Sequence, residues 1–133
     1  STYRDQGRWE EAETLQIQVM EIRKKVLGDE HPSTLSSMAN LASIYWDQGR
    51  LKEAETLQVQ VMEMCKKVLG DEHPDTLSSM ANLAFTWKSQ GRFEDALALL
   101  QNCLHLQQQI LGPNHPYAVS THTTVSRWTK EAI

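Results

Sequence analysis

The sequence has few cysteines and no long apolar run, and each shortage excludes a class of protein. Its 133 residues include only two cysteines, Cys65 and Cys103. A small secreted domain normally carries a larger, regular set, so we expect two free thiols in a reducing compartment; a disulfide would need both on one surface. No apolar run is long enough to span a bilayer, and no basic segment precedes an apolar one. We therefore expect a cytoplasmic protein with no membrane contact.

The chain also lacks excess positive charge and the short motifs of common enzymes. Its formal net charge is −4 and its isoelectric point is near 5.7, so no basic footprint for nucleic acid is present. No nucleophile elbow, phosphate-binding loop or paired-histidine motif appears. We predict neither nucleic-acid binding nor enzymatic activity, and no cofactor.

What the sequence does contain is a repeat with a period of 42 residues. Leu-Gly-Asp-Glu-His-Pro at Leu27 returns at Leu69 and, as Leu-Gly-Pro-Asn-His-Pro, at Leu111. A Gly-Arg pair keeps the same period, at Gly7, Gly49 and Gly91. The chain therefore reads as one array of units 7–48, 49–90 and 91–133. Residues 1–6 match residues 43–48, and we expect them to be the tail of a truncated preceding helix.

Each unit predicts two helices. In residues 51–69 apolar side chains recur at steps of 3 and 4, and residues 9–27 and 93–111 match them. We name these three segments the B helices. The segments 32–48, 74–90 and 117–132 begin near a proline, which suits a first helical turn, and we name them the A helices. About six helices are expected, the last of them more polar and suited to cap the array.

The first two units are nearly identical. Residues 7–48 and 49–90 differ at 11 of 42 positions and agree at 31. Side chains that are identical in both units are explained by the geometry of the repeat. An active site instead needs an asymmetric polar cluster. This pattern favours a structural or binding role over catalysis.

The A-helix pattern resembles a known family. Met38-x-x-Leu41-Ala42-x-x-Tyr45, followed by Gly49, resembles the helix-turn-helix of the tetratricopeptide repeat. The usual period is about 34 residues, and the longer unit with Leu-Gly-x-x-His-Pro is similar to the kinesin light chain type, also found in sensor regions of NOD-like receptors. The resemblance implies an all-α, right-handed superhelix of antiparallel helix pairs. Helical HEAT repeats, whose period reaches a similar length, are the alternative.

Three histidines recur at one position of each repeat, at His31, His73 and His115. Neighbouring helix layers pack about 8–10 Å apart, whereas zinc holds its nitrogen ligands at about 2 Å. One ion cannot bind all three, so we predict no metal site. Their position before proline indicates helix capping.

The resemblance implies a protein–protein interaction module, within a larger protein, that binds an extended peptide segment in the groove lined by the A helices. Asn40 and Asn82 lie where such repeats clasp a peptide backbone, and an amide can both donate to and accept from a main chain. Alternatively, both amides satisfy hydrogen bonds between helices. The groove residues that we predict are Ser36, Asn40, Ser43, Trp46, Ser78, Asn82, Phe85, Lys88, Thr124 and Lys130.

Two further expectations concern partners. The equivalent positions Arg4, Trp46, Lys88 and Lys130 hold three cations and one aromatic ring, which favours a ligand with acidic residues. The alternative function is a structural or self-assembly scaffold with no specific peptide ligand. It rests on the first B helix, where Trp9, Leu15 and Val19 have too little covering and exposed apolar stripes associate.

Overall fold

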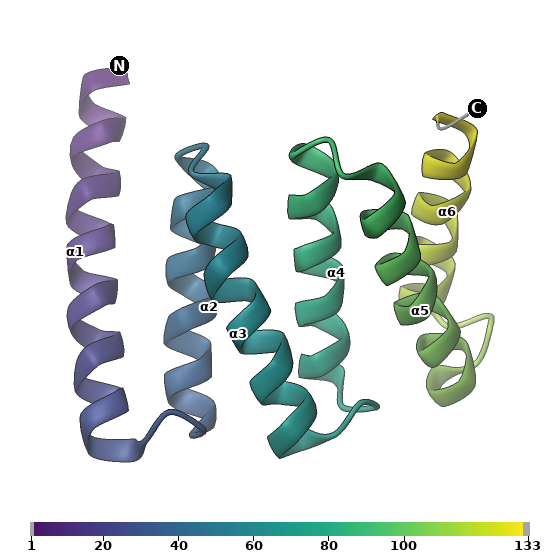
Figure 1. Ribbon diagram of the computed structural model, residues 1–133, viewed down its shortest axis with the longest axis horizontal. Coiled ribbons are helices and arrows are strands. Elements are labelled where there is room, and N and C mark those ends of the chain that lie inside the picture. Colours follow the sequence, from purple (N-terminus) through teal and green to yellow (C-terminus); the bar gives the residue numbers. More distant parts are fainter. Residues whose placement is uncertain (1, 132–133) are drawn as a thin grey trace. The chain divides into compact units, whose positions relative to one another are not determined.

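The computed structural model describes the backbone of residues 2–131 and the side chains of residues 7–131. Within this stretch the chain forms helices and no strand (Figure 1). The helices are α1 (Thr2–Leu27), α2 (Pro32–Asp47), α3 (Leu51–Leu69), α4 (Pro74–Ser89), α5 (Phe93–Leu111) and α6 (Pro116–Glu131). Their bounds from α2 onward agree with the predicted helices to within about one residue, and the predicted all-α class is confirmed.

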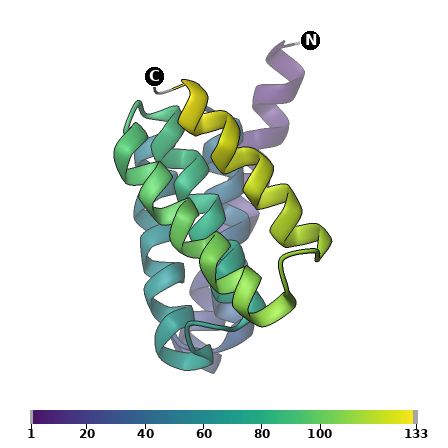
Figure 2. The same cartoon turned by 90° about the vertical axis from the view of Figure 1, so that its right-hand side faces the viewer.

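The helices belong to two compact units, residues 1–64 and residues 65–133. In the first unit α1 packs against α2, and in the second α4 packs against α5 and α5 against α6 (Figures 1 and 2). The division falls inside α3, so it coincides with none of the boundaries of the predicted repeat units.

The connectors between B and A helices are held by the same bond in the first two repeats. The Thr34 hydroxyl donates to the carbonyl oxygen of Gly28 at 2.8 Å, and the Thr76 hydroxyl donates to that of Gly70 at 2.7 Å. Both threonines are fully buried. A buried hydroxyl costs free energy unless it is hydrogen-bonded, and here it satisfies a carbonyl that the helix end leaves open.

The connectors between A and B helices depend on glycine. Gly49 and Gly91 have φ angles of +78° and +85°, a region that other L-residues rarely adopt. The bond from Arg50 N to the carbonyl oxygen of Tyr45, at 2.8 Å, closes the end of α2, and Arg92 N bonds in the same way after α4. These are the chain reversals that the Gly-Arg pairs predict.

The first Gly-Arg pair does not behave in this way. Sequence matching predicts a helix end at Gly7, but α1 continues from Thr2 through Gly7 to Leu27 as one helix. Continuing the helix through one glycine costs about 1 kcal/mol, and it keeps the backbone hydrogen bonds that a reversal would break.

The core of the second unit joins α4, α5 and α6. Ala84, Ala96, Leu100, Leu104, Val125 and Trp128 form one buried cluster. Trp128 is 1% exposed, although α6 is the most polar of the A helices. The opposite side of α6 faces solvent, since His122 and Thr129 are exposed. The polar last helix is therefore anchored by a single large aromatic ring.

No helix in the described part of the chain is long and apolar enough to cross a membrane.

Exchanging glycine for alanine at two positions tests the continuous α1. Gly7→Ala removes a glycine from a helix interior and should raise the free energy of unfolding by about 0.5–1 kcal/mol. Gly49→Ala places a side chain at positive φ and should lower it by about 1–2 kcal/mol. A Cβ atom meets no neighbour within 4 Å at either site, so both effects are conformational. Urea unfolding followed by circular dichroism measures both; equal effects would contradict the structure.

Replacing Trp128 tests how far α6 depends on its one buried ring. Trp128→Ala should lower the free energy of unfolding by about 3–5 kcal/mol, as large-to-small core substitutions do. His122→Ala, on an exposed position of the same helix, is the control and should change it by less than about 0.5 kcal/mol. Unfolding is monitored by far-ultraviolet circular dichroism, because the substitution removes a fluorophore. Equal stabilities of the two variants would show that α6 is not anchored in this way.

Candidate functional site

The exposed side of α2 carries four of the predicted groove residues. This helix buries Leu35, Met38, Leu41 and Ala42, which leaves the other side to solvent. Ser36, Asn40 and Ser43 are exposed, and Trp46 is 43% exposed. Steps of 4 and 3 place these positions along one helix face. The structure thus presents this polar set together on one surface.

The amides of Asn40 and Asn82 are exposed at the same repeat position of α2 and α4. Among residues 7–131, neither side chain makes a hydrogen bond within its own unit. The alternative expected from sequence, in which these amides join helices, therefore has no counterpart inside either unit. Each amide keeps two N–H donors and a carbonyl acceptor for another molecule.

The exposed side of α4 combines polar residues with an aromatic ring that reaches α6. Ser78 and Asn82 are exposed, and Phe85 is 41% exposed. The edge of one ring of the Phe85–Trp128 pair meets the face of the other, with centroids 5.3 Å apart and planes at 87°. Such edge-to-face pairs contribute about 0.5–1.5 kcal/mol beyond the area they bury. Phe85 is therefore partly a surface residue and partly a packing residue.

Lys88 contacts two aromatic rings and a carboxylate, which the sequence does not indicate. Its ammonium lies 5.3 Å from the ring centroid of Trp128, 5.5 Å from that of Phe93 and 3.1 Å from the Glu131 carboxylate. The side chain is 27% exposed. An ion pair at this exposure contributes little to stability, so the charge can exchange partners at small cost.

The two predicted groove residues on α6 differ in accessibility. Thr124 is half-buried, and its hydroxyl donates to the Ser120 carbonyl oxygen at 3.1 Å. A hydroxyl in such a local bond offers less to a peptide backbone than an asparagine does. Lys130 is exposed. The side chain of Arg4, the fourth member of that row, lies outside the described residues.

An arginine at the start of α3 joins three parts of the first unit. The Arg50 guanidinium lies 4.3 Å from the ring centroid of Tyr45 and donates to Glu13 of α1 at 2.9 Å. Its hydrogen bonds to Glu53 and Glu13 raise the pKa of Arg50, so the side chain stays charged. Burial, and then Glu13, raises the pKa of Tyr45, which keeps the phenol neutral. This arrangement fixes the helices behind the exposed face of α2.

The repeated histidines are helix caps, as predicted. The Nδ1 atoms of His31, His73 and His115 accept hydrogen bonds from backbone N–H groups two residues on, at 3.1, 3.0 and 3.1 Å. Each such bond satisfies an N–H group that a helix start leaves without a partner. In the described part of the chain, no cluster of three His, Cys, Asp or Glu residues could hold a metal ion.

Both cysteines are buried free thiols. Burial raises the pKa of Cys103 to about 11, and burial and Asp75 raise that of Cys65, so neither forms the nucleophilic thiolate at neutral pH. The position of Cys65 is held by Arg23 in the first repeat. Arg23 reaches the Ser33 carbonyl oxygen and the Ser37 hydroxyl at 2.9 and 2.6 Å, and the shorter cysteine is enclosed instead.

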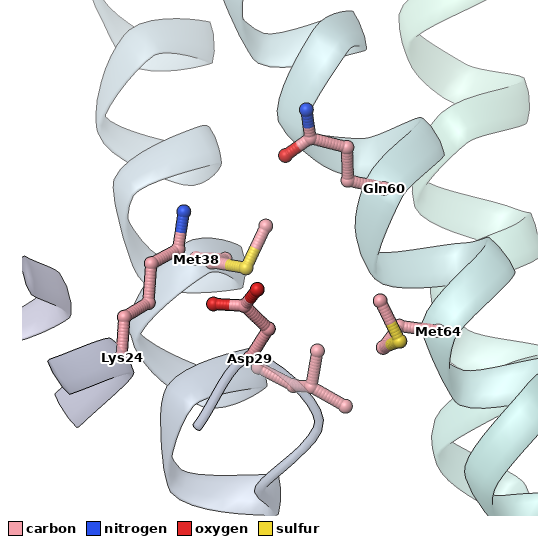
Figure 3. A pocket seen from close by; sticks show the side chains of 6 residues that line it. Lys24, Asp29, Met38, Gln60 and Met64 are labelled. Carbon is pink, nitrogen blue, oxygen red and sulfur yellow. The ribbon is translucent and has the colours of Figure 1, made fainter. Parts of the chain in front are cut away.

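Sequence reasoning missed one pocket and one residue. A pocket of about 260 Å³ in the first unit is lined by Lys24, Asp29, Leu35, Met38, Gln60 and Met64 (Figure 3). It joins three apolar side chains with an ammonium, a carboxylate and an amide, and it depends on how three helices meet. Trp128 was missed because its repeat equivalents are Ile44 and Thr86. A lone tryptophan in a polar helix was the available signal.

Comparison with known proteins gives the same architecture. The tetratricopeptide repeat family matches residues 1–67 and 37–96, and again residues 76–117. No curated protein matches the chain. The chain is similar to the nearly identical TPR-like repeats of a Podosopora anserina protein described as kinesin light chain. Identity to that protein is 34% over 96% of this chain, with a TM-score of 0.83, and a single-residue variant of the same protein matches equally.

BtubC (BKLC) from P. vanneervenii shares the fold, with a TM-score of 0.84 and 19% identity over 98% of this chain. The chain spans 60% of the P. anserina structure and 51% of the P. vanneervenii one. The predicted solenoid of antiparallel helix pairs and its kinesin light chain-like type are confirmed. The matched segments and the shared helix order show that this chain belongs to the tetratricopeptide repeat family.

Proposed function

We propose that this chain is a protein interaction module that binds an extended peptide segment of a partner through the exposed faces of its A helices. Tetratricopeptide repeats are typical of protein–protein interaction modules. The observation that carries the proposal is the pair of exposed amides, Asn40 on α2 and Asn82 on α4, neither of which has a hydrogen-bond partner within its own unit.

The chemistry of these faces suits main-chain recognition. An extended peptide presents N–H and C=O groups along its length, and an asparagine amide can pair with both kinds. The neighbouring Ser36, Ser43 and Ser78 add short hydroxyl groups without bulk, so side chains of the ligand can vary. Trp46 and Phe85 supply exposed rings on which an apolar ligand side chain can pack.

We further propose that the ligand is acidic. Lys88 and Lys130 lie on the helices that present Asn82 and Thr124, and the Lys88 ammonium already holds a carboxylate, that of Glu131, at 3.1 Å. A ligand carboxylate would take the place of Glu131 beside a cation that two aromatic rings also stabilise. The proposal is binding rather than catalysis, because Ser36 and Asn40 recur as Ser78 and Asn82, whereas an active site needs an asymmetric polar cluster.

Amide removal tests the peptide-binding role. A peptide selected from a random library for this chain should bind Asn40→Ala and Asn82→Ala variants several-fold more weakly each, because each substitution removes hydrogen bonds worth about 0.5–1.5 kcal/mol. Binding is measured by fluorescence anisotropy after circular dichroism confirms folding. Asn102→Ala, an exposed asparagine on the B helix α5, is the matched control and should bind as the unaltered chain does. Equal binding by all three variants would refute the proposed role.

Ionic strength tests the charge of the ligand. Raising salt from about 0.01 M to 0.15 M shortens the screening length from about 30 Å to 8 Å, so the affinity of an acidic peptide should fall. Lys88→Gln should weaken binding and reduce this salt dependence. Lys52→Gln, on the B helix α3, should leave both unchanged. An affinity that does not vary with salt would contradict the acidic ligand while leaving backbone recognition intact.

A further inference from the structure

A pocket in the first unit combines an apolar floor with charged groups at its rim. Its volume is about 260 Å³, and three helices and one connector supply its lining. All of that lining lies within residues 1–64, the first compact unit. The lining residues are Lys24 at the end of α1, Asp29 in the connector, Leu35 and Met38 of α2, and Gln60 and Met64 of α3 (Figure 3).

The floor of the pocket is apolar. Leu35 and Met38 are each 5% exposed, and Met64 is half-buried. Methionine side chains are flexible and polarisable, so they adapt to the shape of an apolar group. With about 3.6 residues per turn, Leu35 and Met38 lie on the side of α2 opposite Asn40. The pocket is therefore separate from the exposed face of α2 that carries the proposed peptide site.

The rim of the pocket carries one cation, one anion and one amide. Lys24 is half-buried, and Asp29 and Gln60 are exposed. Figure 3 shows the Asp29 carboxylate between the side chains of Lys24 and Met64. Among residues 7–131, neither Lys24 nor Asp29 forms an ion pair or a side-chain hydrogen bond. An ion pair between two such accessible groups would contribute little to stability, so both charges are available to a ligand.

Size and charge together define the ligand. Pockets for drug-sized molecules measure about 300–1,000 Å³, so a pocket of 260 Å³ suits a smaller molecule. The matching ligand has a carboxylate for Lys24 and an ammonium for Asp29. It also has an aliphatic group that leaves water when it packs on the apolar floor. An α-amino acid with an aliphatic side chain carries these three groups on one carbon atom.

We propose that this pocket is a binding site for a free aliphatic α-amino acid of about the size of leucine. The carboxylate of the ligand pairs with the Lys24 ammonium and accepts a hydrogen bond from the Gln60 amide. The ammonium of the ligand pairs with the Asp29 carboxylate, and its side chain packs on Met38 and Met64. A residue at either end of a peptide has only one of the two charges, so the free amino acid matches the rim better than a chain end does.

Methionine methyl resonances give a local test in the intact chain. The chain has five methionines, and two of them, Met38 and Met64, line the pocket. L-leucine titrated into the 133-residue chain, labelled at its methionine methyl groups, should shift both resonances saturably. Met20, on α1, does not line the pocket and should not shift. Absence of any shift at the highest soluble leucine concentration would overturn the proposal, and so would equal shifts of all three.

Analogues of leucine test the three contacts one at a time. Glycine lacks the aliphatic side chain and should bind about tenfold more weakly or worse. N-acetyl-L-leucine lacks the ammonium and L-leucinamide lacks the carboxylate, so each should bind several-fold more weakly. These two analogues also represent the last and the first residue of a protein. Binding of either one as tightly as leucine would show that a chain end is the ligand and would overturn the proposal.

Single substitutions test the two charges of the rim. Lys24→Gln and Asp29→Asn should each weaken leucine binding several-fold. Lys25→Gln and Asp47→Asn remove the same charges at exposed positions of the first unit outside the pocket, and both should bind as the unaltered chain does. Circular dichroism confirms that all four variants stay folded. Equal binding by all four would contradict the assigned contacts.

Exchanging the two charges gives a result that a purely structural role would not produce. Three fixed contacts distinguish the mirror images of leucine, and interchanging two groups on the α-carbon gives the mirror image. The double variant Lys24→Glu, Asp29→Lys should therefore prefer the enantiomer that the unaltered chain disfavours. An unchanged preference would overturn the assignment of the two charges and the proposal with it.

One control separates this site from the proposed peptide site. The Asn40→Ala, Asn82→Ala variant should bind leucine normally, and Lys24→Gln should bind the extended peptide normally. Failure of one proposal would therefore leave the other intact.

Discussion

The structure depends on one contact made repeatedly, the burial of an apolar B-helix stripe under the preceding A helix. Neither helix covers its own apolar side, and a lone pair of helices would leave too much of it in water. Ala96 and Ala84 show why the fit is close, because two residues without long side chains let α4 and α5 approach each other. Stability in such an array comes from the sum of neighbouring contacts rather than from one central core.

The helix bounds and the helix caps could be predicted from sequence, because the residues that determine them are close together in the chain and recur in each repeat. Proline at the start of an A helix, histidine before it and glycine after each helix act through the backbone of a few neighbouring residues. The bounds of α2 to α6 and the capping role of His31 follow from them. The near-identity of the first two units also shows that the exposed asparagines occupy equivalent places.

The features that sequence does not predict depend on which helices lie next to one another, and local sequence signals do not give that information. Gly7 is followed by an arginine, as Gly49 is, yet it lies within the continuous helix α1. Cys65 stands where the first repeat has Arg23, and its burial is not evident from that polar equivalent. The engagement of Lys88 depends on residues about 40 positions away in the chain. At the candidate site, sequence therefore identifies the exposed residues but not their mutual contacts.

The aromatic pair of Phe85 and Trp128 has a further consequence for how the chain finds its fold. Units that agree at 31 of 42 positions offer each helix nearly equivalent partners, so pairing one repeat out of step sacrifices little local stability. At the places of Phe85 and Trp128 the preceding copy has Ser43 and Thr86, too small to make the same contact. The contact between Phe85 and Trp128 therefore favours the correct pairing of α4 and α6 over a pairing that is shifted by one repeat.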